Sequence, residues 1–199
     1  MTFKQIFKDS RIVGLCGNKD SGKTNNLISL VNTLNKSIKC YFYGIDSKVK
    51  HYLIKKGHTE ISSLNHLANK RDCVLILDEF QKLKLNDRRY KDLLQAVINF
   101  AYHNNVYIVF CSPAVREFNS VIGSYIEKWL IKSINLDDCI NGSQLKKAIL
   151  DYKGEYKSDL GFIDIPKNKL LVLNNECEVV LNCDYVKDID NKASLKKLF

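Results

Sequence analysis

An eight-residue stretch near the N-terminus has the residue types and spacing of a phosphate-binding loop. Residues 17–24 read Gly-Asn-Lys-Asp-Ser-Gly-Lys-Thr, which is the pattern G-x-x-x-x-G-K-[ST]. The two glycines allow the backbone to turn successive N–H groups around a phosphate. Lys23 can reach the β- and γ-phosphates of a nucleotide, and the Thr24 hydroxyl can bind Mg²⁺. The predicted binding residues are Gly17, Asn18, Lys19, Asp20, Ser21, Gly22, Lys23, Thr24 and Asn25.

The segments on either side of this loop support that interpretation. An apolar strand is predicted over 12–16, and a helix over 24–35. A strand, a glycine-bounded loop and a helix in this order place the positive end of the helix at the phosphate. A chance glycine-rich loop is the alternative.

A second stretch combines a buried strand with two carboxylates. Residues 73–77 are continuously apolar, as in a strand covered on both faces of a parallel sheet, and Asp78 and Glu79 follow. Ligands of α/β sheets bind at the carboxyl ends of the strands. Asp78 is therefore a candidate Mg²⁺ ligand, and Glu79 a candidate general base that polarises an attacking water. The alternative is a strand followed by a solvated acidic turn.

A third candidate lies at the end of the apolar segment 106–112, which Pro113 terminates. If this strand neighbours the loop, its last residue, Ser112, lies next to the γ-phosphate and can sense the phosphate state. An ordinary serine at a strand end remains the alternative.

The remaining pattern predicts an α/β fold with a mostly parallel sheet flanked by helices and a small C-terminal β-rich extension. We expect a core domain over 1–135 and an extension over 136–199 that packs on it. Further strands are predicted over 39–45, 128–134 and 178–182, a β-hairpin over 161–165 and 170–173, and helices over 48–56, 61–68, 88–104, 115–125 and 143–152.

Composition bounds the setting of the protein. The 199 residues carry a net charge of +9, which suits a polyanionic partner but equally describes a lysine-rich solvated surface. The seven scattered cysteines form no C-x-x-C pair, and the four histidines have no metal-ligand spacing. With no apolar run of about 20 residues and no signal-peptide pattern, a reducing cytoplasm is the expected location and no membrane partner is expected.

The order of these motifs resembles the additional-strand class of P-loop ATPases, in which another strand separates the strands of the Walker A loop (17–24) and the Walker B acid (Asp78). Within that class the chain is most similar to the FtsK–HerA branch, particularly viral genome-packaging ATPases. The resemblance covers about residues 10–135 and implies ATP and Mg²⁺ as cofactors, a homo-oligomeric ring and double-stranded DNA as a partner.

Two positions depart from that branch. Ser112 and Pro113 stand where a glutamine usually ends the strand after Walker B, and Tyr102 stands where a trans-acting arginine often occurs. An arginine finger must then come from elsewhere. Arg116 is the first candidate, Arg89 the second, and Arg88 also remains available.

Two basic segments are candidate contacts to DNA phosphates without sequence reading. Residues 82–91 carry five basic side chains against one acidic one, and the tip of the expected hairpin carries Lys167 and Lys169. Solvated surface is the alternative for both.

Three functions are compatible with these motifs. The first is an ATP-driven motor that translocates double-stranded DNA, with packaging of a viral genome as its task and the host cytoplasm as its location. The second is a nucleotide-dependent loader or switch that docks a protein partner. The third is a small nucleoside or nucleotide kinase, although the arginine-rich lid of such enzymes is not evident in the sequence.

Overall fold

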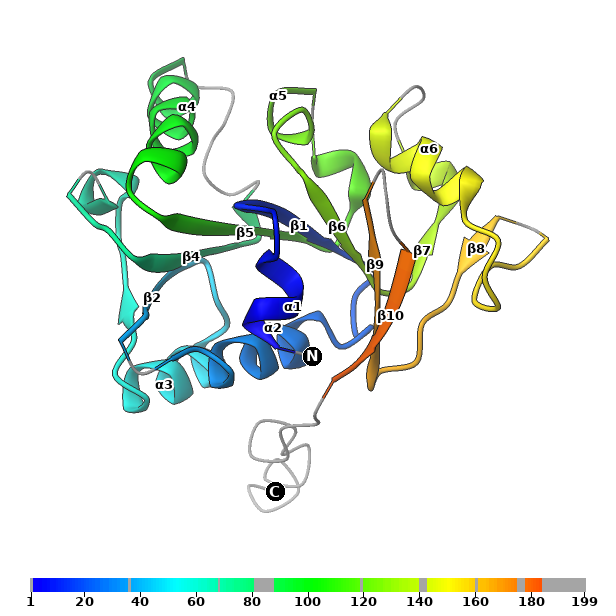
Figure 1. Ribbon diagram of the computed structural model, residues 1–199, viewed down its shortest axis with the longest axis horizontal. Helices are drawn as coiled ribbons and strands as arrows, with labels where there is room; N and C mark the ends of the chain where they lie inside the picture. The colour runs from blue at the N-terminus through cyan, green and yellow to red at the C-terminus, as the bar shows by residue number, and fades with distance from the viewer. Residues whose placement is uncertain are drawn as a thin grey trace, which may run out of the picture.

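The computed structural model is built on one twisted, mostly parallel sheet (Figure 1). It describes residues 2–35, 37–67, 69–80, 88–118, 120–139, 143–159, 161–174 and 178–183. Within these residues, eight strands form the sheet in the order β10-β9-β6-β1-β5-β4-β2-β3. Their bounds are β1 Ile12–Cys16, β2 Lys39–Tyr43, β3 Thr59–Glu60, β4 Cys73–Asp78, β5 Val106–Ser112, β6 Lys128–Ile131, β9 Lys169–Leu173 and β10 Glu178–Asn182.

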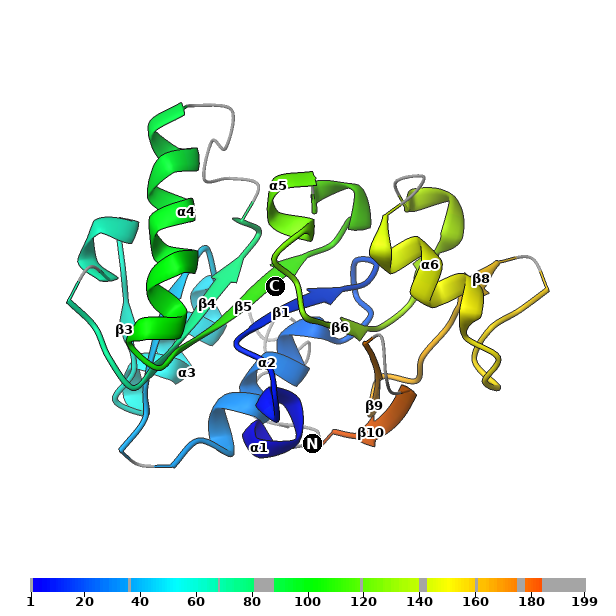
Figure 2. The same cartoon turned by 45° about the horizontal axis from the view of Figure 1, so that its top comes forward.

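Helices cover both faces of this sheet. Figures 1 and 2 show α1 (Phe3–Phe7), α2 (Lys23–Asn32) and α3 (Ser47–Lys55) on one face, and α4 (Arg88–His103), α5 (Ser120–Gly123) and α6 (Gln144–Asp151) on the other. Alternate residues of β1 and β5 enter the two cores. Ile12 and Ile108 pack on the α4 side, whereas Val13 and Val109 pack on the α2 side. This arrangement explains why the central strands are apolar on both faces.

The additional strand lies where the Walker motifs require it. β5 pairs in parallel with β1 on one side and with β4 on the other. The strand that leads into the glycine loop and the strand that ends at Asp78 are thus separated by one strand. The predicted α/β fold with a mostly parallel sheet is confirmed.

Most predicted elements occur within a few residues of their expected bounds, with exceptions that have a physical cause. The helix expected over 115–125 is split into the 3-10 turn η3 (Val115–Glu117) and α5. Phe118 lies between them and inserts its buried ring against Phe80 and Trp129, with ring centroids 4.9 and 5.0 Å apart. Burial of this side chain takes precedence over continuation of the helix. The helix expected over 61–68 is only the 3-10 turn η1 (Leu64–Leu67).

The predicted hairpin over 161–165 and 170–173 is wrong. β8 (Phe162–Ile163) pairs with β7 (Ile134–Asn135), while β9 joins the main sheet between β6 and β10. β9 is apolar on both faces and buried from its second residue onward, so a position inside the sheet covers more of it than a two-stranded ribbon could. The hairpin occurs one strand later, between β9 and β10.

Three further observations complete the fold. The first residues contain α1, for which no helix was predicted and which begins with a capping box between Thr2 and Gln5. Among the described helices, none is long and apolar enough to cross a membrane. The cysteines at 16, 40, 73 and 111 lie in strands, and no disulfide joins the cysteines of the described residues.

Candidate nucleotide-binding site

The glycine loop starts at the carboxyl end of β1, in the middle of the sheet. All five residues of β1 are buried, and the strand is paired on both sides, so the start of the loop is fixed. A β-carbon added to Gly17 would lie 2.5 Å from the β-carbon of Lys132, so only glycine fits at this position. Gly22 has a φ of +94° and directly precedes α2. This left-handed conformation favours glycine, and it turns the chain into the helix.

The start of α2 has the properties of an anion site. Its N-cap is Gly22, which has no side chain to cap the first N–H groups, so the positive end of the helix dipole is uncovered. Lys23 Nζ donates hydrogen bonds to the carbonyl oxygens of Gly17 and Asn18, at 2.6 and 2.8 Å. The ammonium therefore lies across the loop, where phosphate oxygens could replace these carbonyls as its acceptors. Thr24 is half-buried in the first turn of the helix.

Two buried side chains near this loop lack partners in the structure. Ser21 Oγ and both polar atoms of the Asn26 side chain make no hydrogen bond, although Ser21 is 8% exposed and Asn26 only 1%. Buried polar atoms are normally paired, so such atoms are a sign of a ligand or water. This observation fits a bound nucleotide at residues 17–25.

Asp78 and Glu79 lie at the carboxyl end of β4, on the same edge of the sheet. Glu79 has a φ of +46°, and its backbone N–H donates a 3.0 Å hydrogen bond to Asp78 Oδ1. Burial raises the pKa of the Asp78 carboxyl, while hydrogen bonds from Cys111 and the Glu79 backbone lower that pKa. The positive charge of Lys23 also lowers the pKa of Asp78, so the two Walker motifs share one electrostatic environment. A half-buried carboxylate close to a phosphate-binding loop is suited to hold Mg²⁺.

Two residues that support Asp78 were missed at the sequence level. Gly44, just after β2, has a φ of +76°, and an added β-carbon would overlap the carbonyl oxygen of Asp78. Cys111 is the register partner of Asp78 on β5, and its side chain hydrogen bonds to the Asp78 carboxyl. Burial raises the pKa of the Cys111 thiol well above its usual range, so this group is a neutral donor to the carboxylate. No local pattern in the sequence indicates either contact.

Comparisons with known proteins agree with this geometry. Neither a protein-family model nor a curated protein matches the chain. Solved structures do match. B204, the DNA-packaging ATPase of Sulfolobus turreted icosahedral virus, is 11% identical with a TM-score of 0.62, and the match covers 88% of this chain and 98% of B204. The pCW3 conjugation coupling protein TcpA is 12% identical with a TM-score of 0.58, and the match covers 95% of this chain and 65% of TcpA.

A third match is to the cytoplasmic domain of the type VII secretion ATPase EccC from Thermomonospora curvata. It is 12% identical with a TM-score of 0.60, over 91% of this chain and 24% of EccC. The chain has the fold of an additional-strand P-loop ATPase. The resemblance to FtsK–HerA-type proteins is thus confirmed at the level of the fold.

Within this additional-strand P-loop fold, two further candidates, Ser112 and Arg116, lie on β5 and just after it. Ser112 ends β5 beside Cys16, is fully buried, and exchanges hydrogen bonds with the backbone of Ala114 at 3.1 and 3.2 Å. These bonds close a local turn, and the role of Ser112 as a phosphate sensor stays a prediction. Arg116 follows in η3 with an exposed side chain. Such a position suits an arginine that acts on a neighbouring subunit, which also stays a prediction.

Tyr102, in the place of the trans-acting arginine, has a structural partner. Its hydroxyl donates a hydrogen bond to Glu127, whose other carboxylate oxygen accepts from the backbone at Ile12. Burial and this bond raise the pKa of Tyr102 to about 12. Of the basic segment 82–91, Arg88, Arg89 and Lys91 form the first turn of α4, and residues 82–87 lie outside the described part of the chain.

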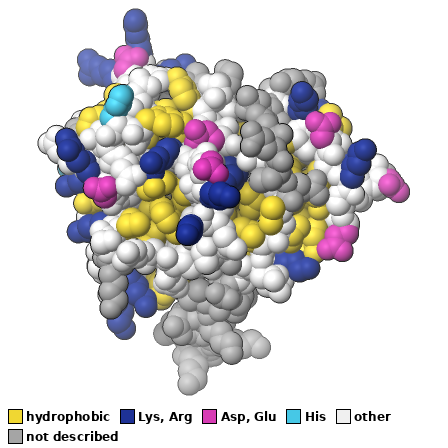
Figure 3. Space-filling view, in the orientation of Figure 1, with side chains coloured by type: hydrophobic (Ala, Val, Ile, Leu, Met, Phe, Trp, Pro, Cys, Tyr) yellow, Lys and Arg dark blue, Asp and Glu magenta, His cyan; other side chains and the backbone are white. Residues whose placement is uncertain are grey.

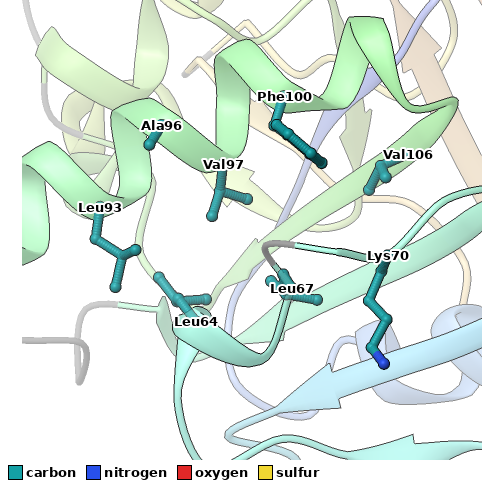
Figure 4. A pocket seen from close by; sticks show the side chains of 8 residues that line it. All are labelled: Leu64, Leu67, Lys70, Leu93, Ala96, Val97, Phe100 and Val106. Atoms are coloured by element: carbon teal, nitrogen blue, oxygen red, sulfur yellow. The ribbon is translucent and has the colours of Figure 1, made fainter.

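An apolar pocket of about 120 Å³ lies away from this site, between η1 and α4 (Figure 4). Its walls include Val106, the first residue of β5, so it is at the edge of the sheet opposite the glycine loop. Among the described residues that line the pocket, Lys70 alone is charged, and the others are aliphatic or aromatic. This pocket is therefore unsuited to a triphosphate.

Proposed function

We propose that the protein is a Mg²⁺-dependent ATPase whose hydrolysis drives the translocation of double-stranded DNA, with packaging of a viral genome as its task. The observation that carries the ATPase proposal is the position of Lys23, Asp78 and Glu79 at one edge of the sheet. One charge attracts phosphates, one carboxylate can hold the metal, and a second can act on water.

Each site residue has a proposed role in binding or hydrolysis. The N–H groups of residues 17–24 and the Lys23 ammonium bind the phosphates and neutralise charge that grows as the bond to the γ-phosphate breaks. Thr24 and Asp78 would hold Mg²⁺, which would supply positive charge to the phosphates. Glu79 orients the attacking water and accepts its proton. Ser112 is proposed to sense the γ-phosphate, and Arg116 to supply positive charge to a neighbouring subunit's nucleotide.

DNA is proposed as the partner on two grounds. The net charge of +9 favours a polyanion, and B204, whose whole length is nearly covered by the match, is a DNA-packaging ATPase. On the face of the molecule that Figure 1 presents, Figure 3 shows dispersed Lys and Arg side chains with acidic side chains between them. Dispersed lysines suit phosphate contacts without base reading. A homo-oligomeric ring and a docking protein complete the proposal, with the reducing cytoplasm as its location.

A protein partner is the second candidate. The observation that favours it is the match to Thermomonospora curvata EccC solved in complex with a signal sequence peptide, at 13% identity and a TM-score of 0.59. In that case the same nucleotide site would serve a loader or switch.

Steady-state ATP hydrolysis, with and without double-stranded DNA at low and moderate salt, separates these functions. A motor that contacts phosphates should be stimulated by DNA, and the stimulation should fade as salt rises. The mass in solution is measured in the same buffer, because an unassembled ring ATPase would also ignore DNA. Lys23→Ala is the control for contaminating ATPases. Hydrolysis by an assembled protein that DNA leaves unchanged would contradict the motor and favour the loader.

A further inference from the structure

A fully buried lysine connects the glycine loop to a segment that belongs to neither Walker motif. Lys132 directly follows β6, and its side chain is 0% exposed. Its backbone N–H bonds to the carbonyl oxygen of Cys16 at 2.9 Å, one residue before the loop. Its ammonium donates hydrogen bonds to the carbonyl oxygens of Pro166 and Lys167, at 2.7 and 3.2 Å, and to that of Lys169.

The next residue repeats this connection. The carbonyl oxygen of Ser133 accepts a 2.7 Å hydrogen bond from the Asn18 backbone, and its hydroxyl donates a 2.6 Å bond to the Asp164 carboxylate. Residues 132 and 133 therefore hold residues 164–168, which we call the β8–β9 loop, and the first residue of β9 against the first half of the glycine loop. At the other end of the glycine loop, a β-carbon on Gly22 would lie 3.4 Å from the carbonyl oxygen of Lys167.

The direction of a bound nucleotide follows from the sheet order. The γ-phosphate must lie toward Asp78 and Glu79, on the side of β1 where β5 and β4 lie. The glycine loop grips the phosphates in the middle, so the ribose and base must leave on the opposite side. That side is formed by β6 and by the β8–β9 loop.

We propose that the β8–β9 loop is the wall of the site that contacts the nucleoside part of ATP, and that Lys132 is the positioning residue that sets it. This inference rests on the proposed nucleotide binding. It replaces the expectation that Lys167 and Lys169 form a hairpin tip directed at DNA. The Lys169 ammonium donates a 2.6 Å hydrogen bond to the Tyr156 hydroxyl.

The test compares two ligands and two buried lysines. Affinities for a non-hydrolysable ATP analogue and for inorganic tripolyphosphate are measured by calorimetry, each with Mg²⁺, on the wild type and on Lys132→Met. The matched control is Lys128→Met. Lys128 is the first residue of β6, the strand that Lys132 directly follows, and it is 5% exposed. It also donates hydrogen bonds to backbone carbonyls, those of Ile6 and Lys8, but away from the glycine loop.

Lys132→Met should lower the affinity for the ATP analogue about tenfold, the equivalent of one or two lost hydrogen bonds, and leave the affinity for tripolyphosphate unchanged. Lys128→Met should alter neither. Equal losses for both ligands would mean that Lys132 merely supports the glycine loop, and no loss for either would mean that the β8–β9 loop touches no nucleotide. Both results overturn the inference.

A second variant and the wild-type result make the test of the inference conclusive. If Lys132→Met does not fold, Ser133→Ala is used, because the hydroxyl of the half-buried Ser133 donates a hydrogen bond to Asp164 of the β8–β9 loop. Ser133→Ala should lower the affinity for the ATP analogue alone, by about two- to threefold. An unchanged affinity overturns the inference. A wild type that binds neither ligand refutes the proposed function itself, whereas a wild type that binds both isolates the role of Lys132.

Discussion

At the scale of single residues, the proposed mechanism separates binding from hydrolysis. In it, Lys23 and the loop N–H groups act on the phosphates, whereas Glu79 acts on water. The left-handed conformation of Glu79 comes directly after the buried end of β4, where its backbone also holds the Asp78 carboxylate. The position of the acid pair is therefore set by the strand, not by the side chains alone.

Glu79→Gln should keep ATP bound while lowering turnover about 10²- to 10⁴-fold, because glutamine cannot accept the proton of the attacking water. Nucleotide retention and phosphate release are measured on the same preparation. Glu155→Gln, at an exposed position, is the control and should retain normal turnover. Normal turnover in Glu79→Gln would refute the general-base role.

Asp78→Asn should stabilise the metal-free protein at neutral pH while abolishing hydrolysis. Burial raises the pKa of Asp78, so the folded protein holds this proton up to a higher pH than the unfolded chain does. Ionisation therefore weakens the folded state as pH rises through the raised pKa, and asparagine removes that cost. Melting temperatures at about pH 7 and about pH 4, the latter near the unperturbed pKa of aspartate, check the sign.

The advantage of Asp78→Asn should shrink at the lower pH, where the wild-type carboxyl is increasingly protonated in both states. A variant that is less stable than the wild type at neutral pH would show that the hydrogen bonds from Cys111 and Glu79 outweigh the cost of burial.

At the scale of elements, the site depends on close contact between neighbouring strand ends. The chain leaving β2 passes directly over the carbonyl of Asp78 at Gly44, so the Walker B acid is packed as well as paired. A side chain at this position must displace β2 or β4.

Gly44→Ala should destabilise the protein by about 2–5 kcal/mol, the sum of a left-handed alanine and an overpacked contact. Gly57→Ala is the matched control, since Gly57 has a similar φ of +87° but nothing within 4 Å of an added β-carbon. It should cost about 1–2 kcal/mol. Chemical denaturation of both variants measures the difference, and equal costs would contradict a tight contact at Asp78.

At the scale of the whole molecule, the proposed ring raises the question whether its subunits act together. A ring with coordinated subunits is disturbed by each inactive member, and Arg116 is proposed to reach a neighbour's nucleotide. Both features need an assembly, which the P-loop site of one chain cannot supply by itself.

Mixing wild type with Glu79→Gln at constant total protein should therefore lower DNA-stimulated hydrolysis more steeply than the fraction of mutant. Mixing with Glu155→Gln should leave it unchanged. Light scattering on each mixture verifies assembly. A strictly linear decrease in an assembled sample would show that subunits hydrolyse ATP independently.

The sequence by itself determined the parts that depend on local order. The glycine loop needs eight consecutive residues, and the Walker B acid needs an apolar run followed by Asp78 and Glu79. Both were predicted because their spacing along the chain is their signal. The bounds of β1 and β5 followed for the same reason, since a strand buried on both faces is a continuous apolar run.

Only the tertiary structure decided which distant segments meet. The hairpin prediction failed because the apolar sequence of β9 is compatible both with pairing to β8 and with a position inside the main sheet. Only the order of the strands in the sheet distinguishes the two arrangements. Gly44 and Lys132 have no local pattern, because each is required by one backbone contact far away in the sequence. Contacts of this kind depend on packing, so the wall of the nucleotide site became visible only in the folded chain.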